Sequence, residues 1–244
     1  MAALQAALSA TLAALLSVSA VPAAAQAANV APADWLWSAS VGADTDYRFR
    51  GVSLSDGKPS LRVAIDVDHG SGAYGGVAVT RVEPTHDDRY ELLRWQLGYA
   101  RRLDGGASID VGIAQSHFTG DARYDYLELQ AGYATADWSV RASVAPDYFG
   151  RGVRTLYVEA QAQRPLGERW RAYAHAGALL SDGARDAADD AAARSRYDLR
   201  LGVAWALRDL DLQLAWVGAT RGGPYPATYE GRRANWVASA TWSF

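Results

Sequence analysis

The sequence predicts an all-β protein: a transmembrane antiparallel up-and-down β-barrel of about 12 strands, preceded by a signal peptide. Three observations support this fold class. Segments in which apolar and polar side chains alternate recur roughly every 10–20 residues. The connections between these segments alternate between short and long. Trp and Tyr, of which the chain has 9 and 13 among 244 residues, gather near the ends of the apolar faces.

The N-terminal segment is distinct from the rest of the chain. Residues 1–27 carry no charge, are most apolar over Leu12–Val21, and end in the small-x-small sequence Ala25-Gln26-Ala27. This pattern is typical of a signal peptide, although the usual basic start is missing. We expect a signal peptide over 1–27, a short periplasmic segment over 28–34 and the barrel over 35–244. The alternative is a hydrophobic N-terminal helix that the protein retains.

Composition excludes several classes of function. The chain has no Cys, which removes disulfides, thiolate catalysis and Cys-ligated zinc. A net charge of -3 and the absence of a long basic run give no reason to expect nucleic acid as a partner. After residue 27 no stretch approaches the roughly 20 apolar residues that a membrane helix needs. Export would therefore lead to the periplasm, the medium or the outer membrane, and no cofactor is expected.

The first predicted strand starts at Trp35 and keeps its period of two as far as Arg50. Odd positions are mainly apolar or aromatic and include Tyr47 and Phe49, which we expect to face lipid at the external girdle. Even positions are polar from Asp44 onward, and we expect the later ones to line the lumen or its mouth: Asp44, Asp46, Arg48 and Arg50.

The later strands repeat this alternation in chain order. Each has a stripe of apolar residues at every second position, opposite polar or small residues. The stripes run from Leu61 to Val67, Leu93 to Tyr99, Ile109 to Ile113, Leu127 to Tyr133, Trp138 to Val144, Leu156 to Ala162, Trp170 to Ala178, Tyr197 to Trp205, Leu212 to Trp216 and Trp236 to Phe244. A weaker segment over 73–82 completes an even count.

The connections sort by length. Short turns are predicted at 70–72, 103–106, 135–137, 165–168 and 208–210, and longer polar loops at 52–58, 83–90, 119–123, 149–154, 181–195 and 221–233. With a periplasmic N-terminus, every long loop falls on the external side, as in outer-membrane barrels. A soluble β-sandwich, the competing fold, has no reason to sort its loops in this way.

Aromatic residues mark the two expected membrane interfaces. The periplasmic girdle would contain Trp35, Trp37, Tyr99, Tyr133, Trp138, Trp170, Trp205, Trp242 and Phe244. The external girdle would contain Tyr47, Phe49, Tyr148, Tyr197 and Trp236. Phe244 ends a lipid-facing stripe and resembles the C-terminal signal read by the outer-membrane assembly machinery. We therefore expect that machinery and outer-membrane lipid as partners.

The candidate site is the opposite, charged face of the strands. An Arg that faced lipid near the midplane would cost about 2–4 kcal/mol, so parity places these residues in the lumen. They could form a hydrated eyelet that selects small polar or anionic solutes, or a ladder of ion pairs that fills a narrow lumen. Twelve strands do not decide between these. The predicted pore-lining residues are Arg48, Arg62, Asp66, Arg94, Asp110, Glu128, Arg141, Glu159, Arg171, His175, Asp198 and Arg200.

Two stretches resemble a known family. TDYRFRGVSLSDGKPSLRVAIDVDHGSGAYGGV at 45–77 and APDYFG at 145–150 are similar to blocks in the TorF-type putative porins of proteobacteria. The resemblance extends over almost the whole mature chain, except for residues 184–196. It implies an outer-membrane barrel with porin activity toward small solutes, and it names no substrate.

Three functions remain open at this point: a porin-like channel, a structural or sensing barrel with a plugged lumen, and a lipid-modifying barrel enzyme. The enzyme hypothesis depends on His117 at the external rim, but its neighbour Ser116 points inward, so no Ser–His pair is expected. The acidic residues of 182–190 lack the spacing and central Gly of a calcium loop, so we expect no metal. We expect no enzyme activity.

Overall fold

The computed structural model describes residues 35–83, 89–182, 195–225 and 233–244. The signal peptide expected over 1–27 and the segment 28–34 lie outside these ranges. The same holds for most of the 181–195 loop. No helix in the described parts of the chain is long and apolar enough to cross a membrane.

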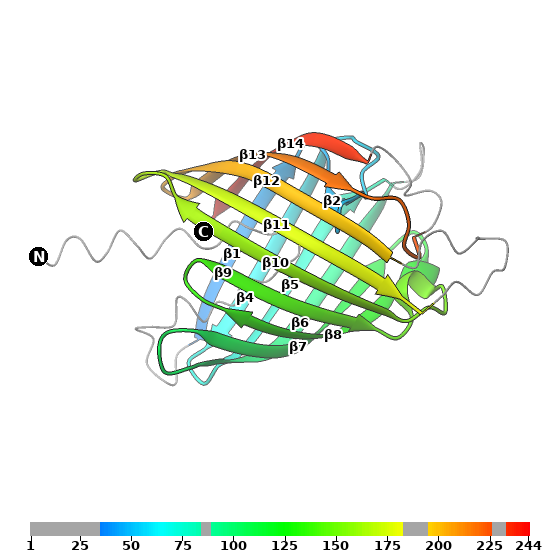
Figure 1. The fold of residues 1–244 in the computed structure, drawn as a ribbon, viewed down its shortest axis with the longest axis horizontal. Coiled ribbons are helices and arrows are strands. Elements are labelled where there is room, and N and C mark those ends of the chain that lie inside the picture. Colours follow the sequence, from blue (N-terminus) through cyan, green and yellow to red (C-terminus); the bar gives the residue numbers. More distant parts are fainter. Residues whose placement is uncertain (1–34, 84–88, 183–194, 226–232) are drawn as a thin grey trace, which may run out of the picture.

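Twelve antiparallel strands close into a barrel (Figure 1). β1 pairs with β4 on one side and with β14 on the other, so the sheet has no free edge. Figure 1 shows the strands inclined to the long axis, with the C-terminus at the left end. The strands are β1 (Trp35–Asp44), β4 (Ser60–His69), β5 (Ala73–Val82), β6 (Tyr90–Arg102), β7 (Ser108–Phe118), β8 (Tyr126–Ala134), β9 (Trp138–Ala145), β10 (Thr155–Pro165), β11 (Trp170–Ser181), β12 (Ser195–Leu207), β13 (Leu210–Ala219) and β14 (Ala234–Ser243).

The barrel confirms the predicted fold class. Each predicted strand is present, and most extend a few residues further because the hydrogen-bond ladder continues past the alternating pattern. The short turns and the longer connections occur in the predicted alternation, and closure of the sheet excludes the β-sandwich. Short elements occur within three of the longer connections: a hairpin of β2 (Arg48–Phe49) and β3 (Val52–Ser53), and two 3₁₀ turns, η3 (Ala122–Tyr124) and η4 (Tyr148–Gly150).

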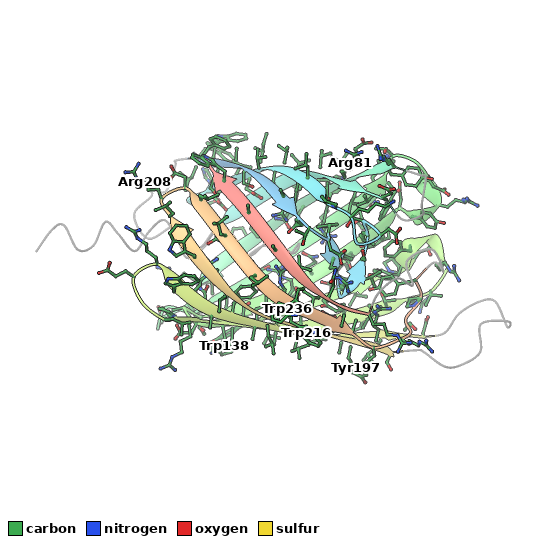
Figure 2. All side chains as sticks on the ribbon, turned by 90° about the horizontal axis from the view of Figure 1, so that it is seen from above. Arg81, Trp138, Tyr197, Arg208, Trp216 and Trp236 are labelled. Atoms are coloured by element: carbon green, nitrogen blue, oxygen red, sulfur yellow. The ribbon has the colours of Figure 1, made fainter. Side chains whose placement is uncertain are left out.

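The outer surface of the barrel is apolar. Trp37, Val111 and Leu129 each leave at least 60% of their surface exposed, and many other large apolar side chains on the outer face are similarly open. An apolar belt of this extent is unusual for a protein surrounded by water. Figure 2 shows Trp138 toward one end of the barrel and Tyr197 toward the other, as expected for two girdles.

The prediction that the first strand continues past Asp44, with Tyr47 and Phe49 facing lipid, was wrong. β1 ends at Asp44, and the following residues, through 59, leave the barrel wall. Tyr47 and Phe49 are buried at 3% and 5% exposure and do not face lipid. The chain reverses at Arg50 and Gly51, whose φ values of 51° and 75° are left-handed and allow the tight β2–β3 turn.

Tyr148 was also misplaced by the sequence pattern. It lies in η4 and is completely buried, so it does not belong to the external girdle. The connection between β9 and β10 therefore folds over the barrel interior. The other two members predicted for that girdle, Tyr197 and Trp236, are exposed on the outer surface, as expected.

Candidate functional site: the barrel lumen

The inner face of the barrel carries a set of buried ion pairs. Glu128 on β8 is fully buried and accepts hydrogen bonds from Arg94 on β6, 3.4 Å away. Arg94 also donates to Ser116 on β7, at 3.0 Å. Three neighbouring strands thus place one carboxylate and its partners on the same inner surface.

A second group crosses the same strands nearer the short turns. Arg141 on β9 lies 3.0 Å from Asp110 on β7, and Asp110 also accepts a hydrogen bond from the Tyr74 hydroxyl. The pair spans β8, where Gly132 leaves the necessary space: a Cβ there would lie 2.3 Å from Oδ1 of Asp110. A side chain larger than hydrogen at this position would displace the carboxylate.

The third group lies on β10, β11 and β12. His175 on β11 contacts Asp198 through Nε2 at 2.8 Å, and its Nδ1 is 3.5 Å from a Glu159 oxygen. The Tyr157 hydroxyl donates to Asp198 at 3.1 Å. Two carboxylates therefore lie within 3.5 Å of one imidazole.

Two more predicted residues, Arg171 and Arg200, lie on the same wall. Arg171 pairs with Asp211 at 2.7 Å. Arg200 donates to Gln213 at 3.4 Å and lies over the Tyr173 ring. Asp211 was not among the residues predicted from the sequence. It lies on the inner face of β13, opposite the apolar stripe from Leu212 to Trp216, and this alternation could have identified it.

Arg48 reaches the lumen by another route. It belongs to the β2–β3 hairpin and not to a barrel strand, and its Nε donates to Asp46 at 2.7 Å. Asp46 also accepts a hydrogen bond from Asn235 on β14, which fixes the start of the hairpin to the barrel wall. The hairpin is therefore anchored where it leaves β1.

Residues 45–59 extend across the lumen, and we call them the inner loop. Nη2 of Arg50, at its tip, donates to Oε1 of Glu128 at 2.7 Å. β8 is separated from β1 by four strands around the ring in one direction and by six in the other, so this contact bridges nearly opposite walls. The next residue, Gly51, packs so tightly on the β12–β13 wall that a Cβ would lie 2.6 Å from those of Asp198 and Ala219.

Aromatic side chains fill the lumen beside the inner loop, at the end with the longer connections. This cluster combines the inner loop, η4 and the strand ends into one core. Its buried members are Tyr47, Phe49, Val52, Leu54, Val82, Leu92, Phe118, Tyr126, Ala145, Tyr148, Phe149, Tyr157, Leu179 and Tyr225.

Two spaces border the inner loop. One, of about 470 Å³, is lined by Arg48, Arg50, Tyr157, Glu159, His175 and Arg200 among others. The second, of about 480 Å³, is lined by Tyr47, Arg62, Asp66, Thr80, Arg94 and Gln96 among others. All twelve residues predicted from the sequence thus lie on the inner side of the barrel, where the loop divides the space they surround.

The chain matches a family model over residues 27–244, described as a bacterial protein of unknown function (Gcw_chp). The chain belongs to this family. No curated protein matches it.

Several solved structures have the same fold as this family member. The NanC porin superposes with a TM-score of 0.58 at 8% identity, over 85% of this chain and 99% of that one. The KdgM porin in complex with disordered oligogalacturonate gives a TM-score of 0.54 at 9% identity, over 86% and 99%. Omp33 of Acinetobacter baumannii gives 0.50 at 8% identity, over 88% and 100%. Identities this low establish the likeness of the fold alone.

His117 lies at the outer rim of this barrel, half-exposed, with its Nδ1 hydrogen-bonded to Asp125. Ser116 is buried on the inner face, where Arg94 donates to it, so the two side chains point away from each other. Within the described residues, no group of three or more His, Cys, Asp or Glu side chains is arranged to hold a metal ion.

The inner loop is also attached at its far end. The ammonium of Lys58 donates a hydrogen bond to Glu83, just beyond β5, and this contact lowers the pKa of the Glu83 carboxyl. The backbone N–H of Glu83 donates to the carbonyl of Leu54 at 2.8 Å. Anchors at both ends leave the tip, around Arg50, as the part of the loop that spans the lumen.

Proposed function

We propose that this protein is a porin-like channel of the outer membrane, which passes small hydrophilic solutes, including anionic ones, by passive diffusion through a narrow charged lumen. The observation that carries the proposal is the contrast between the two faces of a closed barrel, apolar outside and lined with paired charges inside. The resemblance of two sequence blocks to the TorF-type putative porins supports the same function.

The outer face supports a location in the outer membrane. A lipid bilayer leaves only helices and closed barrels as spanning structures, because every backbone polar group must be paired internally. Here each strand is paired on both sides and the side chains between the girdles are apolar. Export would depend on residues 1–27, and assembly on the terminal Phe244.

The inner face supports passage of polar solutes. Opposed guanidinium and carboxylate groups give a polar wall that can replace part of a solute's hydration shell. The guanidinium groups of Arg50 and Arg200 border the space on the β8–β13 side, and they favour solutes that carry a negative group. No cofactor is required for such diffusion.

Conductance measurements test this proposal. The refolded wild-type protein and a variant in which residues 46–56 are replaced by a short Gly-Ser linker are inserted into planar bilayers under a KCl gradient. We expect discrete current steps, with a reversal potential displaced toward that of chloride. If both proteins insert with heat-modifiable migration and neither produces steps, the channel function is wrong.

The alternative function is a structural or sensing barrel with a plugged lumen, and one observation favours it: the aromatic cluster around the inner loop is completely buried. The same experiment separates the two. A silent wild-type protein whose linker variant conducts has a lumen closed by the loop alone. A third function, lipid hydrolysis at His117, predicts activity in the wild-type protein that is lost in His117→Ala.

A further inference from the structure

A buried ion pair joins the tip of the inner loop to the far wall of the barrel. Arg50 is 92% buried, as its exposure is 8%, and its guanidinium forms a 2.7 Å hydrogen bond with Glu128. This contact joins the tip of the loop directly to β8, on the far wall.

The surroundings of this guanidinium form a cage. Its central carbon lies 4.2 Å from the ring centre of Tyr157, 4.7 Å from that of Phe49 and 5.5 Å from that of Tyr148. Aromatic faces attract cations, and the attraction strengthens when water is excluded. Three rings and the carboxylate of Glu128 thus make a site of the kind that binds organic cations. In the closed barrel the protein's own arginine occupies it.

Not every hydrogen-bond donor of the Arg50 guanidinium is paired. Nη1 of Arg50 has no hydrogen-bond partner, although it is buried. Glu128, in contrast, keeps a second partner in Arg94 if Arg50 leaves. Arg50 also borders a space lined by Glu159 and His175. Loss of the Arg50 side chain alone would therefore leave the cage empty beside this space while the loop still crosses the lumen.

We infer that Arg50 is a latch that holds the inner loop across the lumen, and that the cage of Phe49, Tyr148, Tyr157 and Glu128 is a guanidinium-binding site that this arginine keeps occupied. This inference rests on the proposed channel function. Release of the latch joins the two spaces beside the loop and opens the pore. Small cations with a planar guanidinium group are the ligands that the vacated cage accepts.

Single-channel recording with chemical complementation tests the latch. Arg50→Ala removes the cation of the contact and Glu128→Gln removes its negative charge, and we expect either to raise the open probability at least about tenfold over wild type, equal to about 1.4 kcal/mol. Millimolar guanidinium chloride should then close Arg50→Ala again, whereas the same concentration of sodium chloride should not. Arg123→Ala is the matched control, since it removes an exposed arginine at the same end of the barrel.

The outcomes separate the inference from the channel proposal. If wild type and both latch variants conduct with the same open probability, the latch is refuted and the channel stands. If Arg50→Ala opens but guanidinium does not close it, or closes Arg50→Ala/Glu128→Gln equally well, the cage is refuted. If even the linker variant stays silent, the channel function itself is wrong, and the latch with it.

Discussion

Replacement of Leu129 by Arg tests whether the outer face of the barrel contacts lipid. Leu129 lies within β8, away from both ends, and is 60% exposed. Transfer of a whole Leu side chain out of water contributes about 1.5–3 kcal/mol, so 60% of this side chain in lipid contributes about 1–2 kcal/mol. An Arg near the midplane costs about 2–4 kcal/mol more. Leu129→Arg should therefore lower the free energy of unfolding by about 3–6 kcal/mol.

Denaturant titration in lipid vesicles, followed by Trp fluorescence and heat-modifiable migration, measures this change. Leu166→Arg is the matched control, because Leu166 is 59% exposed but lies in the short turn after β10. Near the interface the same substitution should cost no more than about 1 kcal/mol. If Leu129→Arg costs no more than Leu166→Arg, or stabilises the protein, β8 faces water and the membrane assignment of this barrel is wrong.

Three further outcomes follow from particular contacts. Arg141→Ala should lower the free energy of unfolding by about 3–5 kcal/mol in the same titration, because it leaves the buried Asp110 carboxylate without its cation; a loss near zero would mean that water already solvates that carboxylate. The Glu83 carboxyl carbon should titrate in NMR with a midpoint below 4.5, and Lys58→Met should return it toward 4.5. Since the pKa of Glu83 is lowered in the folded protein, the stabilisation from this contact is fully present above the ordinary carboxyl pKa. It is lost as the pH falls through the lowered value. Removal of Phe244 should reduce assembly in the outer membrane, measured as the heat-modifiable fraction in cells, and undiminished assembly would exclude it as a signal.

The strands could be predicted from the sequence because two different solvents act on the two faces of each strand. Along β6, Leu93, Trp95 and Leu97 alternate with polar or small residues, and only a sheet with lipid on one side and a polar interior on the other uses every position of that pattern. The same constraint acts on all twelve barrel strands, so errors at single positions do not change the overall assignment.

The partners of the inward charges could not be predicted in this way. Parity gives the face of a residue, whereas its partner depends on register and on how far a side chain reaches. Arg141 reaches across Gly132, its direct neighbour on β8, to Asp110 on β7. A glycine that only provides room for a neighbouring side chain leaves no distinct periodic signal.

The inner loop shows a more general reason for failure. Residues 45–50 continue the alternation of β1, so period alone extends the strand to Phe49. The chain instead turns inward. An aromatic side chain is removed from water among Tyr126, Tyr148 and Tyr157 just as it is at a lipid interface. Hydrophobic pattern measures the preference for leaving water, and it does not distinguish lipid from a filled lumen.

The two sequence blocks that resemble the TorF-type porins meet at this same place. TDYRFRG supplies the inner loop with Phe49 and Arg50, and APDYFG supplies η4 with Tyr148. Phe49 and Tyr148 both lie outside the barrel strands, and their rings come together around the guanidinium of Arg50, at 4.7 Å and 5.5 Å. A barrel wall needs only an alternating pattern, whereas a contact between two loops inside the lumen needs particular residues. The contact between the two blocks lies in the segment that crosses the lumen, which makes Arg50 and Glu128 the first positions at which substitution should change what passes through it.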